Sequence, residues 1–313
     1  MNDSLAPGAT PRIWIAFAIM CLGMFMAILD IQIVTTSLPT IRTALRIAPE
    51  QMVWIQTAYL TAEIVAIPLT GYLTRLLGMR WLFVTAISLF TLASAACAAS
   101  NGFVPLIAAR IVQGFAGGTL IPAVFSAVFL LFPERQQSLA TTLAGVAAVL
   151  APTVGPVVGG WITQTYSWHW LFLVNVGPGV IAAAAAARLL RTAAAMERGH
   201  AAFDGLALLA LAGGLTALEL ALKDAPGLGW GSARVLGEIA LMLGAAAVFA
   251  RRTLRARHPV VELRLLRNRN FAVGSALSFV LGVGLFGSTY LMPFFLGLVR
   301  EIEEHTSELQ SPC

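Results

Sequence analysis

The feature that most constrains this chain is a series of about nine apolar runs, most of them long enough to cross a bilayer as a helix of about 20 residues. The runs fall near Ile13–Leu38, Met52–Leu73, Leu82–Ala99, Phe103–Phe132, Leu139–Ile162, Trp168–Leu190, Phe203–Leu222, Val235–Ala250 and Phe271–Val299. Only 11% of the residues are charged and 58% are hydrophobic, whereas soluble chains carry about 25% charged residues. The sequence therefore predicts an all-α polytopic membrane protein, and the first run is too long for the apolar core of a signal peptide.

The basic residues between the runs predict the orientation. If the N-terminus is cytoplasmic, fourteen of the 20 basic residues lie inside, five lie outside and Arg110 lies within the membrane. Because cytoplasmic loops carry an excess of Lys and Arg, this distribution favours a multi-pass protein of the cell (inner) membrane with a cytoplasmic N-terminus. Membrane topology also explains the net charge of +5, so we expect no nucleic-acid partner.

Several kinds of chemistry lack a sequence signal. The three cysteines form no disulfide framework, and the four histidines have no metal-site spacing. A phosphate-binding loop of the GxxxxGK[ST] type is missing as well. We therefore expect no cofactor, no metal and no catalytic residues, and any transport must draw on a gradient. A membrane-embedded transferase is the alternative from another class, but no paired carboxylates or His–Asp set supports it.

Arg110 lies inside the fourth run, in LIAARIVQGFAGG. A charge near the centre of a membrane helix costs about 2.5–3.5 kcal/mol, and such residues usually face a partner or a polar cavity. At 1.5 Å per residue, Asp30 lies about 12 Å and Arg110 about 10 Å below the outer ends of their spans. We predict that the two charges pair, either as a functional site or as a structural ion pair between packed helices.

Glu63 is a third candidate, about 18 Å from the outer end of the second run. Without a partner, a buried glutamate tends to be neutral. This would suit a proton carrier, and it suits equally well a neutral side chain bonded to a neighbouring helix. Glu219 and Glu238 lie near predicted span ends, so we expect them at the membrane interface.

The fifth run contains APTVGPVVGGW, in which glycines and prolines are locally unfavourable for a helix. Gly155 and Gly159 are four residues apart, so one helix face is bare and a second helix can approach it closely. The pattern predicts tight packing, or packing combined with a bendable contact. Gly114 and Gly118 give the fourth run a similar face.

Two segments that connect the apolar runs are rich in basic residues. GYLTRLLGMRWLF (71–83) predicts a short cytoplasmic loop, either an ordinary turn or a latch of the inner gate. RRTLRARHPVVELRLLRNR (251–269) is the most basic stretch. It predicts either an amphipathic linker on the anionic inner leaflet or a solvated connector.

Several of these motifs occur together and in order. LDIQIVTTSLP, GYLTRLLGMR, IAARIVQGFAGG, APTVGPVVGG, WHWLFLVNVGPG and FGSTYLMPFFL all lie between residues 13 and 300. In this respect the chain resembles the major facilitator superfamily, in particular its fourteen-span drug:proton antiporters of the EmrB/QacA type.

The resemblance implies a fold and a function. The expected fold has a cytoplasmic N-terminus (1–12), a complete six-helix bundle (13–190), two extra helices with a basic linker (191–270) and the first helix of a second bundle (271–300). The implied function is proton-coupled multidrug efflux of amphipathic compounds by alternating access around a midplane site. Transport of another organic solute is the runner-up. Implied partners are the small-molecule substrate, protons, the lipid bilayer, and a periplasmic adaptor with an outer-membrane channel.

The resemblance also assigns roles to residues. Asp30, Arg110 and Glu63 would serve proton coupling or substrate binding. The span-five motif would be the antiporter hinge, and the loop after the second span would be the cytoplasmic gate. The hinge residues are Pro152, Gly155, Pro156, Gly159 and Gly160, and the gate residues are Gly71, Arg75, Gly78 and Arg80. The gate departs from the family pattern, because Thr74 replaces an acid and Met79 a basic residue.

The segment after Arg300 reads EIEEHTSELQSPC and has no apolar period. It resembles the translation of a sequencing-adapter oligonucleotide, so we expect residues 301–313 to be a non-native tail on a C-terminally truncated frame. A native exported tail is the alternative. A chain that holds one bundle and one helix of the next is expected not to complete a transport cycle alone.

Overall fold

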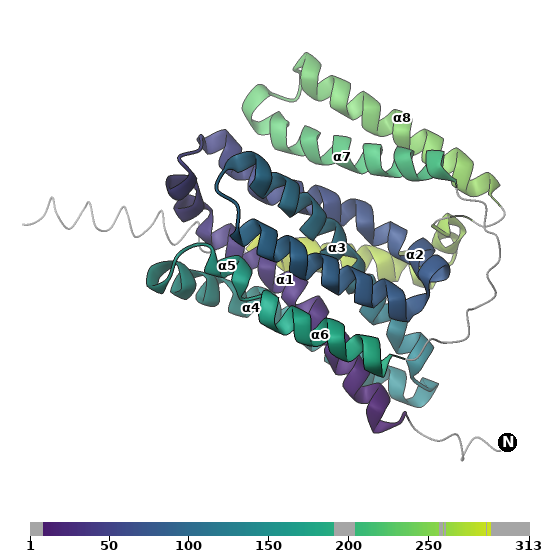
Figure 1. The fold of residues 1–313 in the computed structure, drawn as a ribbon. Helices are drawn as coiled ribbons and strands as arrows, with labels where there is room; N and C mark the ends of the chain where they lie inside the picture. The colour runs from purple at the N-terminus through teal and green to yellow at the C-terminus, as the bar shows by residue number, and fades with distance from the viewer. Residues whose placement is uncertain (1–8, 191–203, 257–258, 260, 286, 289–313) are drawn as a thin grey trace, which may run out of the picture. The chain divides into compact units, whose positions relative to one another are not determined.

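The computed structural model describes residues 9–190, 204–256, 259, 261–285 and 287–288 (Figure 1). The proposed tail and most of the second-bundle motif FGSTYLMPFFL lie outside these residues. Within them, the structure is entirely helical apart from connecting turns. The helices are α1 (Pro11–Leu45), α2 (Pro49–Ala98), α3 (Phe103–Leu131), α4 (Glu134–Thr165), α5 (Trp170–Leu173), α6 (Val176–Leu189), α7 (Gly205–Leu228), α8 (Ala233–Arg255) and the 3₁₀ helix η1 (Leu263–Arg267). A further helix covers Arg269–Leu285.

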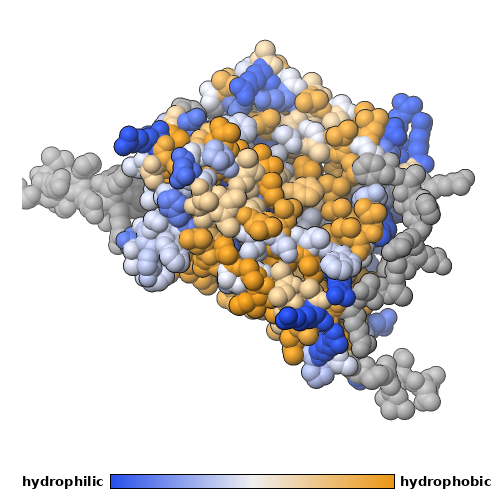
Figure 2. All heavy atoms as spheres, viewed as in Figure 1, coloured by the Kyte–Doolittle hydropathy of each residue, from blue (hydrophilic) through white to orange (hydrophobic). Residues whose placement is uncertain are grey.

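The chain divides into two compact units, residues 1–262 and 263–313. Helices α1 to α8 belong to the first unit, and η1 and the helix Arg269–Leu285 belong to the second. Among the described residues, seven helices are long and apolar enough to cross a membrane, with α2 counted once and α5 and α6 counted together. Hydrophobic residues cover the middle of the visible face, whereas the most hydrophilic ones gather toward the helix ends (Figure 2). The all-α multi-pass architecture predicted from the sequence is confirmed.

Helix α2 contains both the second and the third predicted spans. Its only non-helical residue is Gly78, with φ 76° and ψ 154°. Tyr59 backbone atoms abut Gly114 of α3, and the Cys97 thiol lies 3.5 Å from the neighbouring Gln113 side chain. Tyr59 and Cys97 are each nineteen residues from Gly78 and reach the same level of α3, so the chain reverses direction at Gly78.

The loop predicted over residues 71–83 is therefore wrong in extent. All of these residues are helical except Gly78. A single residue suffices for the reversal because its backbone lies in a region that essentially only glycine occupies. The predicted turn is real, but it is confined to one position.

Helices α7 and α8 form a hairpin that packs through small residues. The buried positions of α7 are Ala207, Gly214, Ala217, Ala221 and Ala225. A Cβ on Gly214 would meet the Ala245 side chain of α8 at 3.3 Å. Small residues let two membrane helices approach closely. Helix α8 has 23 residues, so the eighth run is longer than the sequence predicted and reaches Arg255.

Replacement of Gly78 by alanine should destabilise the first unit by about 1–3 kcal/mol, because alanine must adopt a backbone conformation reserved for glycine. Gly71→Ala is the matched control, since Gly71 is helical with open space around its Cβ position. The control should be neutral, or stabilise by up to about 1 kcal/mol. Equilibrium unfolding in mixed detergent micelles measures both, and equal stability of the two variants would refute the assignment of the turn to Gly78.

Candidate functional site: a buried charge pair and its polar network

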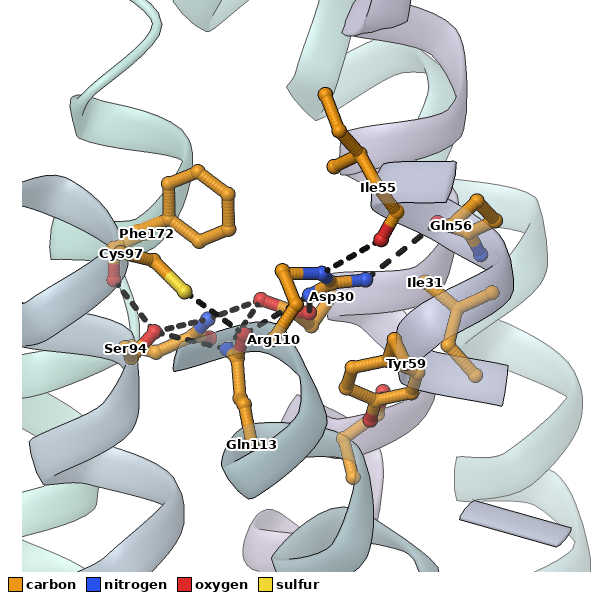
Figure 3. A network of polar contacts seen from close by, with 12 residues as sticks. Asp30, Ile31, Ile55, Gln56, Tyr59, Ser94, Cys97, Arg110, Gln113 and Phe172 are labelled. Carbon is orange, nitrogen blue, oxygen red and sulfur yellow. Dashed lines mark hydrogen bonds and ion pairs between the residues drawn. The ribbon is translucent and has the colours of Figure 1, made fainter. Parts of the chain in front are cut away.

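Asp30 and Arg110 form an ion pair in the core of the first unit (Figure 3). Asp30 lies on α1 and Arg110 on α3, and the Asp30 Oδ2 to Arg110 Nη1 distance is 2.5 Å. Both side chains are completely buried. The equal depth predicted from helix geometry is therefore confirmed, and each charge faces a partner instead of lipid.

Three donors satisfy the Asp30 carboxylate. Arg110 donates to Oδ2, and the side-chain amides of Gln113 and Asn175 donate to Oδ1 at 2.9 and 2.8 Å. The same two amides also donate to the Ser94 hydroxyl, at 3.0 and 3.2 Å. Ser94 in turn donates to the Phe172 carbonyl oxygen at 3.0 Å. The network thus joins α1, α2, α3, α5 and Asn175, which lies in the turn between α5 and α6.

The Arg110 guanidinium is held by acceptors on both sides. It donates to Gln113 Oε1 at 2.9 Å, to the Ile55 carbonyl oxygen at 3.3 Å and to Gln56 Oε1 at 3.4 Å. Its Cζ atom lies 4.1 Å from the centre of the Tyr59 ring, which contributes a cation–π contact. These acceptors and the ring together offset the free-energy cost of burying the Arg110 charge.

The polar partners of the pair were not singled out in the sequence. Gln113 carried a usable signal, because it follows Arg110 by three residues and so lies on the same helix face. Asn175 and Ser94 are isolated polar residues in apolar stretches, and no spacing connects them to Asp30. Only the packing of distant helices brings these two residues to the carboxylate.

Glu63 is not part of this network. Its side chain is 6% exposed, and no hydrogen bond or ion pair joins its carboxylate to Asp30 or Arg110 in the described part of the chain. Its backbone oxygen borders Gly118 of α3. The prediction of a buried acid below the level of Arg110 agrees with this position, one helical turn from Tyr59.

Glu219 lies on α7, which continues for nine residues beyond it, to Leu228. Its side chain is half-buried, and its carboxylate accepts a hydrogen bond from the Thr61 hydroxyl of α2. The interfacial position of Glu219 stays a prediction. Glu238, near the start of α8, pairs with Arg234 at 3.3 Å, in agreement with an interfacial position.

The span-five motif forms part of the continuous helix α4, which runs through Pro152 and Pro156. A Cβ on Gly159 would lie 2.9 Å from the Ile33 Cα and carbonyl oxygen of α1, and a Cβ on Gly155 would collide with the Gln32 side chain. The predicted bare face is thus confirmed and packs on the helix that carries Asp30. Gly160 has open space at its Cβ position, so it lies outside this contact.

The two predicted gate arginines, Arg75 and Arg80, differ in their surroundings. Arg80 donates to the Ala187 carbonyl oxygen at 2.5 Å, near the C-terminal end of α6. Arg12 donates to the next two carbonyls, of Arg188 at 2.8 Å and Leu189 at 3.3 Å. Helix C-termini carry unpaired carbonyls and a partial negative charge, which the two guanidinium groups satisfy. Arg75 is exposed.

Loss of either charge should destabilise the protein by about 3–5 kcal/mol, because the remaining partner becomes an unpaired buried charge. The test compares Asp30→Asn, Arg110→Gln and the double variant by thermal unfolding in detergent. The double variant should recover a large part of the loss, since neither charge remains. Additive losses in the double variant would show that the two side chains do not interact.

Two adjacent glycines of α4 should respond in opposite ways to alanine. Gly159→Ala should destabilise by about 1–3 kcal/mol, because the new methyl group meets rigid backbone of α1. Gly160→Ala is the matched control and should be neutral or stabilise by up to about 1 kcal/mol. Unfolding in detergent measures both, and equal effects would contradict the close α1–α4 contact.

Comparisons with known proteins place these features in a family. Residues 20–311 match the model of the Major Facilitator Superfamily. The colistin resistance protein EmrB of Acinetobacter baumannii is 36% identical over 295 residues, which cover 92% of this chain and 57% of that protein. A putative multidrug resistance protein MdtD of Escherichia coli is 33% identical, over 89% of this chain and 58% of that protein. The multidrug transporter protein MdtP of Bacillus subtilis is 31% identical, over 93% of this chain and 54% of that protein.

The chain thus spans somewhat more than half the length of the curated relatives it matches. Among solved structures, a crystal structure of a D-xylose-proton symporter covers 75% of this chain and 66% of its own, with a TM-score of 0.51 and 15% identity. This likeness concerns the fold alone. On the family match and the sequence relatives together, the chain belongs to the major facilitator superfamily.

Proposed function

We propose that the complete protein exports amphipathic small molecules across the cell (inner) membrane in exchange for protons, by alternating access. The observation that carries the proposal is the fully buried Asp30–Arg110 pair. Its carboxylate accepts hydrogen bonds from Arg110 and Gln113 of α3 and from Asn175, between α5 and α6. Intramembrane acids of this kind mark proton and substrate pathways. The names of the relatives, which include colistin resistance and multidrug resistance, support export of toxic compounds.

The mechanism follows from what a proton does to this network. While Asp30 is ionised, it holds Arg110, Gln113 and Asn175 together. A proton taken up by the carboxylate removes its charge, so the attraction to Arg110 weakens. Helix α1 is then less firmly tied to α3, while its glycine contact with α4 leaves a smooth surface along which it can shift. Release of the proton on the cytoplasmic side restores the pair.

Both charges are fully buried in this conformation. The proton therefore has to reach Asp30 in another state of the cycle, which is the behaviour that alternating access requires. Glu63 is the second acid of the proposal, one turn of α2 beyond the network. We assign these residues to coupling, and chemical catalysis forms no part of the proposal.

The arrangement in the membrane is also part of the proposal. Arg12 and Arg80 gather at the C-terminal end of α6, and by the excess of basic residues in cytoplasmic loops this end faces the cytoplasm. Residues 13–190 would form one bundle, 191–270 the two extra helices and linker, and 271–300 the first helix of the second bundle. The EmrB-type resemblance adds a periplasmic adaptor and an outer-membrane channel as partners.

The experiment measures dye efflux and dye exchange in cells or vesicles that carry the complete gene with Asp30→Asn or Arg110→Ala. Uphill, proton-driven efflux should fall at least about tenfold in Asp30→Asn, because the lost step requires a titratable carboxylate, whereas downhill exchange should persist. Asp30→Glu, which keeps a carboxylate, and Glu63→Gln are the comparison variants. Signals are normalised to folded protein in the membrane. Unchanged uphill efflux in both Asp30→Asn and Arg110→Ala would remove the pair from coupling.

A further inference from the structure

A basic pocket lies at the end of the α7–α8 hairpin where α7 begins and α8 ends. It has a volume of about 510 Å³ and is lined by Asp204, Leu206, Val248, Arg251, Arg252 and Arg255. These residues form a compact group because the last two turns of α8 lie beside the first turn of α7. The pocket shares no lining residue with the Asp30–Arg110 network, and the transport proposal makes no use of it.

The charges of this basic pocket are only partly balanced. Arg252 Nε donates to both carboxylate oxygens of Asp204 at 2.9 Å. This hydrogen bond, with a second from the Ala207 amide, lowers the pKa of Asp204 from its ordinary value, so the carboxylate stays ionised and neutralises Arg252. Arg251 and Arg255 are exposed, and no ion pair involves either of them in the described part of the chain. Within the described residues, the pocket therefore presents two positive charges without an acidic partner.

The apolar wall of the pocket continues along α8. Leu206 and Val248 are 52% and 41% exposed. Gly244 and Leu241 precede Val248 by four and seven residues and so share its face of the helix. Both are exposed, and Gly244 has open space at its Cβ position. From Leu241 to the first arginine, Arg251, helix α8 rises about 15 Å, which is about half of the hydrocarbon thickness of a bilayer.

We propose that the basic pocket binds the phosphate headgroup of an anionic phospholipid, with Arg251 and Arg255 on the headgroup and the Leu241–Gly244–Val248 stripe along an acyl chain. A guanidinium group is suited to phosphate because its planar donors pair with two oxygens at once. Free phosphate would use only the arginines, whereas a phospholipid uses both the charges and the apolar stripe. The site would anchor the pocket end of the α7–α8 hairpin at the membrane surface.

The test titrates the purified chain in detergent with phosphatidylglycerol and with phosphatidylcholine, and counts bound lipids by native mass spectrometry. Arg251→Gln/Arg255→Gln should weaken phosphatidylglycerol binding about thirtyfold and leave phosphatidylcholine unchanged. Stability should stay the same, because neither arginine forms an ion pair with any residue that the structure describes. Arg42→Gln/Arg46→Gln is the matched control, since it removes two exposed arginines at the same spacing from the opposite end of the bundle.

Two results would overturn the proposal. Equal losses in the two double variants would show that binding reflects net charge and not this pocket. Inorganic phosphate that displaces phosphatidylglycerol at equal concentration would show an anion site without a lipid. Retained phosphatidylglycerol selectivity in the control, together with no displacement by phosphate, would support it. Because the readout is lipid binding, the result does not depend on whether the protein transports anything.

Discussion

Burial of a charge away from water constrains this structure more than any other interaction. Arg110 and Asp30 are each fully enclosed, and neither is tolerable there without the other. The requirement fixes the neighbours as well, since the carboxylate needs the amides of Gln113 and Asn175 and the guanidinium needs acceptors from α2. Four helices and the turn that carries Asn175 converge on this point. The rest of the bundle can be understood as the scaffold that brings them together.

The helices of the bundle approach one another most closely at glycines, which have no side chain. Gly114 rests on the Tyr59 backbone, and Gly159 rests on the Ile33 backbone of α1. The first contact positions the ring that lies beneath Arg110, and the second lies on the helix that carries Asp30. Because lipid supplies no hydrophobic driving force between helices, such packing holds membrane bundles together. The glycine motifs and the charge pair are therefore parts of one arrangement.

Much of this follows from the sequence, and the reasons for the rest are specific. The depth of Asp30 and Arg110 follows from helix rise alone, because each is a single charge in an otherwise apolar run. Asn175 and Ser94 could not be found in this way, since an isolated amide or hydroxyl has no periodic pattern. The motif groups Gly160 with Gly159, yet one residue of helix rotation turns Gly160 away from α1. The sequence predicts too long a loop around Gly78, because residue propensities do not reveal that one glycine can reverse the chain.

The account depends on Asp30 being able to gain and lose a proton within its network. Infrared difference spectroscopy of the complete protein in lipid, recorded on substrate addition, tests this directly. It should show a change in a protonated-carboxyl band in the natural protein, and this band should be missing in Asp30→Asn and keep its size in Glu219→Gln. An Asp30 carboxylate that stays ionised from acidic to alkaline pH, with and without substrate, would contradict the proposed coupling and leave the pair a purely structural one.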